Sequence, residues 1–174
     1  MNKVRIFFKL ATFLFYLHCA GIYNKPTPIE NKSIPAISKN IRFEFTGFYF
    51  YKKELQLLKK EILQSGFAET PNSPLLLEVI LEEKEVSYKY EFLHAANFVA
   101  SLFTVGIIPY YTITQHKITY RFSENAKLLG SSTQILELDQ LRGLSMLPVT
   151  YFFWPSNAFD KSILDSWKVY EDLK

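Results

Sequence analysis

The chain contains a single cysteine and only six glycines in 174 residues, and both shortages exclude classes of protein. One cysteine cannot form an internal disulfide, so the fold must be stable without one. So few glycines leave no glycine-rich loop of the kind that cradles phosphate groups. The formal charge of +3 comes from Lys3, Arg5 and Lys9, because the rest of the chain has 17 basic and 17 acidic residues. This balance removes the simplest argument for nucleic-acid binding.

Residues that could perform catalysis or hold a metal are also scarce. Beyond the N-terminal segment only His94 and His116 remain, and neither lies in a short motif with carboxylates or another histidine. Gly143 lies two residues before Ser145, as in a nucleophile elbow, but Leu147 stands where that motif has its second glycine. The acidic run within 82–85 is typical of a solvated strand edge. The sequence predicts a protein that is not an enzyme and holds no metal or cofactor.

The N-terminus has the three parts of an export signal. Residues 1–9 are basic, Leu10–Leu17 is an apolar run of eight residues, and the lone Cys19 follows almost directly. Eight apolar residues are too few to cross a bilayer, which takes about 20. The four residues that end at Cys19 resemble the lipobox of bacterial lipoproteins. By that resemblance residues 1–18 are a signal peptide and Cys19 carries the lipid, palmitate included.

Two alternatives for this segment stay open. One is a plain secretory signal cut near Ala20, and the other is an uncleaved membrane anchor over residues 6–23. Ala20 follows the cysteine where some lipoproteins have an aspartate that retains them at the inner membrane. By resemblance this indicates the outer membrane of the cell envelope, facing the periplasm. Residues 19–40 contain three prolines and no hydrophobic period, which predicts a flexible tether after the lipid-bearing cysteine.

Residues 41–174 show the periodicities of a single α+β domain. Alternating apolar and polar positions predict strands at 41–51, 75–92, 112–122 and 133–141. Apolar residues at helical spacing predict helices at 52–64 and 160–173, with Asp160 as the N-cap of the second. We therefore expect an antiparallel or mixed sheet of about four strands, with two helices on one face and two apolar inserts.

The two inserts, 95–111 and 144–155, contain no charged residue. Three interpretations stay open: part of the core, a membrane-touching or re-entrant pair of loops, and a surface for an envelope protein partner. An integral membrane protein, anchored by 6–23 and by a helix across 95–111, is a further alternative. Within the first insert, Phe98, Leu102 and Val105 predict a helical stripe packed on the sheet, followed by an exposed tip. The candidates for membrane or partner contact are Ile107, Ile108, Tyr110, Tyr111, Phe153 and Trp154.

The first insert also holds a stretch, 101–109, with the pattern Ser-Leu-x-Thr-x-Gly-x-x-Pro. In this pattern the chain resembles small uncharacterised bacterial envelope lipoproteins, and the resemblance covers most of the mature chain in its order of elements. That order also looks like the small lipoprotein that plugs the lipopolysaccharide-export barrel. The first resemblance implies a lipoprotein and no activity. The leading hypothesis is a lipid-anchored envelope protein that binds or scaffolds a partner.

Overall fold

The computed structural model describes residues 19–32, 39–86, 88 and 90–171, so the predicted signal peptide lies outside the described residues. The chain divides into two compact units, each built from three separate stretches. Of the described residues, unit 1 comprises those within 19–23, 85–114 and 138–159. Unit 2 comprises those within 24–84, 115–137 and 160–171.

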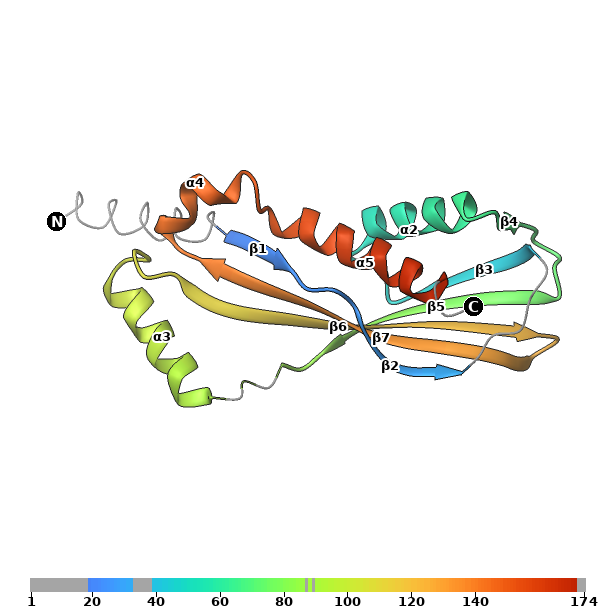
Figure 1. Ribbon diagram of the computed structural model, residues 1–174, viewed down its shortest axis with the longest axis horizontal. Coiled ribbons are helices and arrows are strands. Elements are labelled where there is room, and N and C mark those ends of the chain that lie inside the picture. Colours follow the sequence, from blue (N-terminus) through green and yellow to red (C-terminus); the bar gives the residue numbers. More distant parts are fainter. Residues whose placement is uncertain (1–18, 33–38, 87, 89, 172–174) are drawn as a thin grey trace. The chain divides into compact units, whose positions relative to one another are not determined.

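The strands form one mixed sheet in the order β1-β7-β6-β5-β3-β4, and β2 also pairs with β7 (Figure 1). Strand β3 runs parallel to β4 and β5, β5 is antiparallel to β6, and β1 and β2 are antiparallel to β7. The strand bounds are β1 (Cys19–Tyr23), β2 (Thr27–Lys32), β3 (Asn40–Thr46), β4 (Ala68–Glu69), β5 (Leu75–Lys84), β6 (Tyr110–Glu124) and β7 (Lys127–Arg142).

Four α-helices and one 3₁₀ turn accompany the sheet in the described residues. They are α2 (Lys52–Gln64), α3 (Glu91–Phe103), η1 (Leu144–Met146), α4 (Leu147–Thr150) and α5 (Pro155–Glu171). Helix α2 has the same bounds as the helix that the sequence predicts at 52–64. Helix α5 begins five residues before Asp160, which therefore lies within the helix and is not its N-cap.

The predicted fold class is wrong, because the sheet has seven strands and the described chain has four helices. Strands β1 and β2 come from the described part of 19–40, which the prolines predict to be a tether. Both lie along β7, and the register of β2 shifts beside Pro28, as befits a residue that cannot donate to the ladder. Helices α3 and α4 come from the uncharged inserts. Side-chain periodicity missed β1, β2 and β4 because these strands are short and show no regular alternation of apolar and polar residues.

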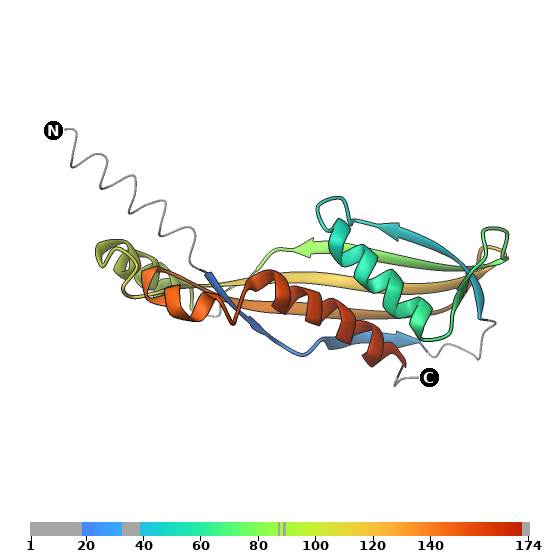
Figure 2. The same ribbon diagram turned by 90° about the horizontal axis from the view of Figure 1, so that it is seen from above.

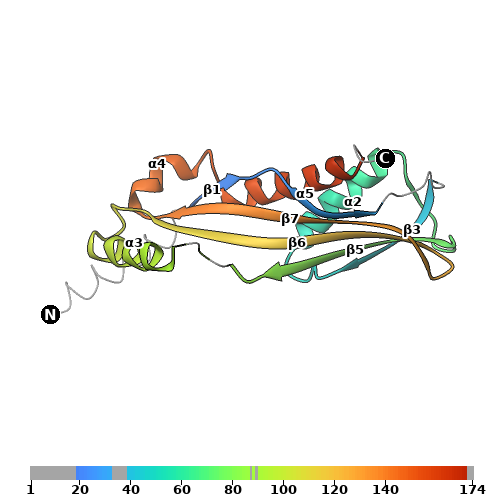
Figure 3. The ribbon, with the colours of Figure 1, turned by 60° about the horizontal axis from the view of Figure 1, so that its bottom comes forward.

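The apolar core lies in unit 2, between the sheet and two helices. Alternate residues of β5, from Leu75 to Leu81, point into this core, and Leu58 and Ile62 of α2 meet them. Helix α2 and the unit 2 part of α5 cover the same face of the sheet (Figures 2 and 3). Fifteen of the eighteen buried apolar side chains of the described residues belong to this unit.

Trp167 connects the layers of unit 2. Its fully buried indole makes edge contacts with Tyr120 of β6 and with Phe67, at ring-centroid distances of 5.5 and 5.8 Å. Its Nε1 donates to Ser65 Oγ, 2.8 Å away, at the C-terminal end of α2. Tyr120 Oη in turn lies 2.6 Å from Ser166 Oγ. The indole therefore buries a large apolar area while satisfying its one polar group.

Replacing Leu58 by alanine should lower the free energy of unfolding by about 2–5 kcal/mol, because its side chain is fully buried in α2. The matched control is Leu63→Ala in the same helix, whose side chain is exposed and should change stability by less than about 1 kcal/mol. Urea denaturation followed by circular dichroism measures both. Equal losses in the two variants would contradict the assignment of the core.

Candidate apolar contact surface

Unit 1 exposes most of its large apolar side chains instead of burying them. Of the 22 exposed large apolar side chains in the described residues, seventeen belong to unit 1 and five to unit 2. Among the described residues of unit 1, only Ala20, Leu138 and Phe159 are buried apolar residues. Exposed apolar side chains that lie together on a surface are candidates for contact with another molecule or a membrane.

Helix α3 has the inverse arrangement of an ordinary amphipathic helix, with polar side chains inward and apolar side chains outward. Its inward side is polar: Ser101 is fully buried, and His94 and Asn97 are half-buried at helical spacing from it. Thr104 follows on the same side at the C-cap. The apolar side chains of the helix are exposed: Phe92, Leu93, Phe98, Val99, Leu102 and Phe103. A surface helix of a water-soluble protein has its apolar side chains on the core side and its polar side chains on the solvent side.

The expected core stripe in this insert is therefore wrong. Phe98, Leu102 and Val105 are 45%, 54% and 47% exposed. The buried position goes to Ser101, which has a small side chain. Spacing alone could not separate the two outcomes, because α3 carries one stripe of apolar residues and one of small and polar residues.

Two polar side chains of α3 hold the loop that follows. Asn97 Nδ2 donates to the carbonyl oxygen of Pro109 at 3.1 Å, and Asn97 Oδ1 accepts from the backbone N–H of Tyr111 at 2.9 Å. Thr104 Oγ1 accepts from the backbone N–H of Ile108 at 3.1 Å. The apolar tip between Thr104 and Tyr111 is thus secured by hydrogen bonds from the helix itself.

The backbone N–H groups of the tip at 105–107 are also paired within unit 1. They donate to the carbonyls of Leu102, Ser101 and Thr104, at the C-terminal end of α3. Gly106 has a positive φ of 76° and is buried, a conformation that suits glycine. A Cβ on Gly143 would lie 2.5 Å from the Gly106 carbonyl oxygen, so these two backbones touch. The Ser-Leu-x-Thr-x-Gly-x-x-Pro pattern therefore builds this turn.

His94 anchors the other end of α3. Its ring stacks on Tyr88, with centroids 3.6 Å apart and planes 12° apart, and its Nε2 lies 2.9 Å from Tyr110 Oη. Tyr88 Oη hydrogen-bonds Thr112 Oγ1 and accepts from the backbone N–H of Ile113. Burial raises the pKa of Tyr110, so its hydroxyl stays protonated at neutral pH. The histidine has a positioning role in this cluster.

The second insert adds exposed aromatic side chains to unit 1. They are Tyr151, Phe152, Phe153 and Trp154, at the end of α4 and before α5. The backbone N–H of Gly21 in β1 donates to the carbonyl of Phe153 at 2.7 Å. The N–H of Ser145 donates to the Gly106 carbonyl at 3.4 Å. These two bonds connect the second insert to the strand that begins at Cys19 and to the tip after α3.

Five of the six predicted contact residues have exposed side chains, namely Ile107, Ile108, Tyr111, Phe153 and Trp154. Tyr110 is half-buried, because its hydroxyl meets His94. The prediction omitted the exposed apolar residues of α3, together with Tyr151 and Phe152. The signal that could have found the α3 residues is the polar stripe of His94, Asn97, Ser101 and Thr104, which predicts that the apolar side faces outward.

Cys19 opens β1 and pairs with Arg142 of β7 across the sheet. Its Sγ lies 3.7 Å from Gln140 Oε1, and Arg142 Nη2 donates to the same oxygen at 2.8 Å. Burial raises the pKa of the Cys19 thiol, and the charge of Arg142 opposes this only in part. A thiol that resists ionisation is a poor nucleophile, so the geometry does not support catalysis by Cys19.

Unit 2 contains a separate titratable cluster. Tyr51 Oη donates to Glu83 Oε1 at 2.8 Å and lies 2.9 Å from Nε2 of the buried His116. Because the tyrosine hydroxyl has one proton, this arrangement places a proton on His116 Nε2. Burial, with Glu83 nearby, raises the pKa of Tyr51 to about 12. Burial lowers the pKa of His116. Both groups are neutral at pH 7, and neither is poised as a nucleophile.

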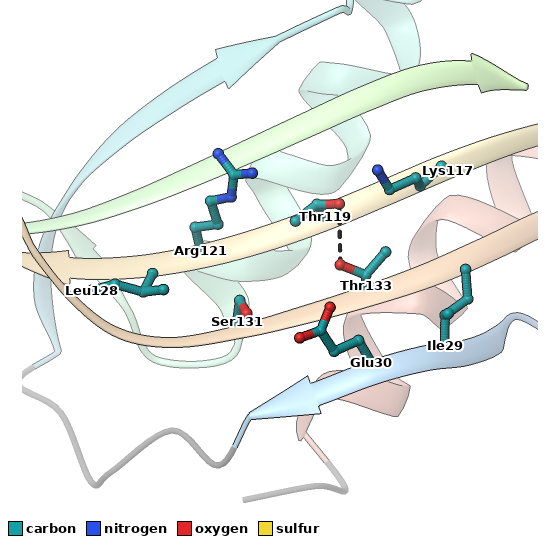
Figure 4. Close-up of a pocket in the computed structure, with 8 residues that line it drawn as sticks. All are labelled: Ile29, Glu30, Lys117, Thr119, Arg121, Leu128, Ser131 and Thr133. Carbon is teal, nitrogen blue, oxygen red and sulfur yellow. Dashed lines mark hydrogen bonds between the residues drawn. The ribbon is translucent and has the colours of Figure 1, made fainter.

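The sheet of unit 2 carries a shallow hollow of about 510 Å³ (Figure 4). Thr119 and Thr133 meet across it, with their Oγ1 atoms 3.3 Å apart. The two cations on its β6 side, Lys117 and Arg121, lie 3.0 and 3.5 Å from carboxylates of β5, which offset their charge. Its other lining residues are Ile29, Glu30, Leu128 and Ser131. The hollow therefore offers weaker grounds for a site than unit 1.

Within the described residues, no group of three or more His, Cys, Asp or Glu side chains could hold a metal ion. Over the same residues, no helix is both long and apolar enough to cross a membrane.

Comparison with known proteins gives weak structural likeness only. No protein-family profile matches the chain, and no curated protein is similar to it in sequence. Among solved structures, the PelC dodecamer from Paraburkholderia phytofirmans is 12% identical with a TM-score of 0.37, and the match covers 80% of this chain and 97% of that one. The rare lipoprotein B from Shewanella oneidensis is also 12% identical, with a TM-score of 0.36, over 76% and 96% of the chains. Likeness at this level carries no argument about function.

Replacing Asn97 by leucine should loosen the tip, because the substitution removes both hydrogen bonds to 109–111. We expect the Tyr111 amide to exchange its hydrogen roughly tenfold faster, equivalent to about 1.4 kcal/mol. The Ile113 amide, which donates to Tyr88, provides an internal control and should keep its rate. Hydrogen exchange measured by NMR tests this, and unchanged protection at Tyr111 would show that Asn97 does not hold the tip.

The lowered pKa of His116 predicts that unit 2 loses stability on mild acidification. As pH falls through 6.5, the histidine of the unfolded chain takes up a proton before the folded one does. Stability is therefore complete above that pH and declines below it. Urea denaturation at about pH 8 and about pH 5.5 should show a smaller decline for His116→Gln than for the wild type. The same decline in both proteins would exclude His116 as its source.

Proposed function

We propose that the chain is a lipid-anchored lipoprotein of the cell envelope that acts as a non-enzymatic binding or scaffolding module. The observation that supports this most is the position of Cys19, the only cysteine, at the end of an export signal. Cys19 is also the first residue of β1, so a chain that begins there keeps every described strand and helix. Its acyl chains would hold unit 1 at a membrane surface.

The titratable clusters support a binding role over catalysis. The tyrosine hydroxyls that meet the two histidines have raised pKa values and keep their protons. By contrast, the exposed apolar side chains of unit 1 form a surface suited to contact. The proposal therefore assigns function to this surface and to the lipid.

The lipid anchor is tested by metabolic labelling of the full chain with radioactive palmitate in a double-membraned bacterial host. The wild type should incorporate the label and gain the mass of a diacyl or triacyl cysteine after loss of residues 1–18. Cys19→Ser should remain unlabelled, because the serine hydroxyl does not replace the thiol in this modification. Ala20→Ser, which changes the neighbouring residue and keeps the thiol, should be labelled like the wild type. A wild-type protein that is unlabelled and begins at Met1 would instead favour an uncleaved membrane anchor.

A further inference from the structure

We propose that the apolar surface of unit 1 inserts into the interfacial region of a phospholipid bilayer. The surface consists of the exposed apolar residues of α3, the tip after it and the aromatic run before α5. This inference rests on the proposed lipoprotein, because it adds a second attachment beside the lipid on Cys19. The protein would then be held in a fixed orientation at the membrane, and not only tethered to it.

The inverse arrangement of α3 is the first argument for a lipid environment. Its polar residues His94 and Asn97 point inward and form hydrogen bonds within unit 1, while Phe92 and Phe103 are 82% and 86% exposed. Burying apolar side chains is the main favourable term in folding, so a sequence that turns them outward requires another apolar phase to receive them. The acyl region of a bilayer is such a phase.

The backbone of the tip is the second argument. A lipid-exposed segment cannot leave N–H or C=O groups unpaired, because the acyl region holds no water to pair with them. Between Val105 and Ile108 every backbone N–H has an acceptor inside unit 1. Asn97 pairs the Pro109 carbonyl and the Tyr111 N–H. The tip can enter lipid without an unsatisfied N–H group along 105–108.

Charge indicates which part of the bilayer is recognised. Neither 92–114 nor 143–159 contains an Asp, Glu, Lys or Arg residue. Attachment therefore depends on apolar burial and aromatic side chains at the interface, not on attraction to anionic headgroups. We expect it in vesicles of neutral phosphatidylcholine and expect high salt to leave it unchanged.

Length and position favour shallow insertion. Helix α3 has thirteen residues, about 20 Å of helix, against a hydrocarbon core of about 30 Å. The surface is continuous with the anchored strand, since Gly21, two residues after Cys19, hydrogen-bonds the Phe153 carbonyl. Acyl chains on Cys19 would therefore enter the bilayer close to the aromatic run before α5.

Trp154 provides a reporter for this surface. The chain has two tryptophans, of which Trp154 is 47% exposed on the surface and Trp167 is fully buried in unit 2. The protein is expressed from its full chain and reconstituted into phosphatidylcholine vesicles with or without brominated acyl chains, which quench indole fluorescence on contact. The difference in emission between the wild type and Trp154→Phe isolates Trp154. We expect its emission to shift to the blue and to lose most of its intensity in brominated vesicles, while the emission of Trp154→Phe changes little.

Two matched substitutions separate the surface from exposed aromatic residues elsewhere. Phe103→Asp places a charge on α3 and should reduce the quenching of Trp154, because charged side chains enter lipid at high cost. Phe50→Asp changes a phenylalanine of unit 2 that is 84% exposed, against 86% for Phe103, and should leave the quenching unchanged. Equal effects of both substitutions would contradict insertion through unit 1.

The remaining outcomes assign a failure to one proposal or the other. If the labelled protein floats with vesicles but Trp154 is not quenched, insertion is wrong and the lipid anchor stands. If Trp154 shifts to the blue without quenching and the chains cross-link in pairs, a second copy covers the surface and insertion is wrong. Failure of the lipid anchor shows in the palmitate label, which does not depend on quenching.

Discussion

The burial of Trp167 is the contact on which the rest of unit 2 depends. This one side chain meets the aromatic ring of Tyr120 on β6 and donates to Ser65 at the end of α2, so it joins both helices to the sheet. Around it lie the alternate apolar residues of β5 and one face of α2. A core with a large, polar-satisfied aromatic group at its centre has one well-defined packing. The described residues of unit 1 contain no comparable centre, and most of their large apolar side chains are exposed.

The two units differ in which side chains they bury and which they expose. Unit 2 has the composition and burial of an ordinary α+β core, whereas unit 1 turns the polar side of α3 inward and exposes its aromatic and aliphatic side chains. The polar groups are used locally: Asn97 and Thr104 hold the tip, and His94 meets two tyrosines. The apolar side of α3 faces outward, and Cys19 begins the first strand of the same unit.

How well the sequence predicted each element depended on how clearly its buried residues show in the order of apolar and polar positions. Helix α2 was predicted with its observed bounds because its apolar face packs on a core, which produces the usual helical spacing. Strands β6 and β7 were predicted shorter than observed. In β7 the inward positions nearest its start are Gly130, Ser132 and Gln134, so burial alternates there without an alternation of apolar and polar residues. The alternation of 86–92 predicted a strand, yet β5 ends at Lys84 and α3 begins at Glu91. Strands β1 and β2 were missed because their residues show no regular alternation of apolar and polar positions.

The sequence by itself determined the position of the lone cysteine, the balance of charge and the two stretches without charged residues. These are properties of composition and order, and no packing can change them. Only the tertiary structure decided that β1 and β2 pair with β7, and which side of α3 faces outward. Both depend on contacts between residues far apart in the chain. A helix with an apolar and a polar stripe can turn either one inward. In α3 the polar stripe faces inward, where His94 contacts Tyr110 and Asn97 contacts the backbone of the tip.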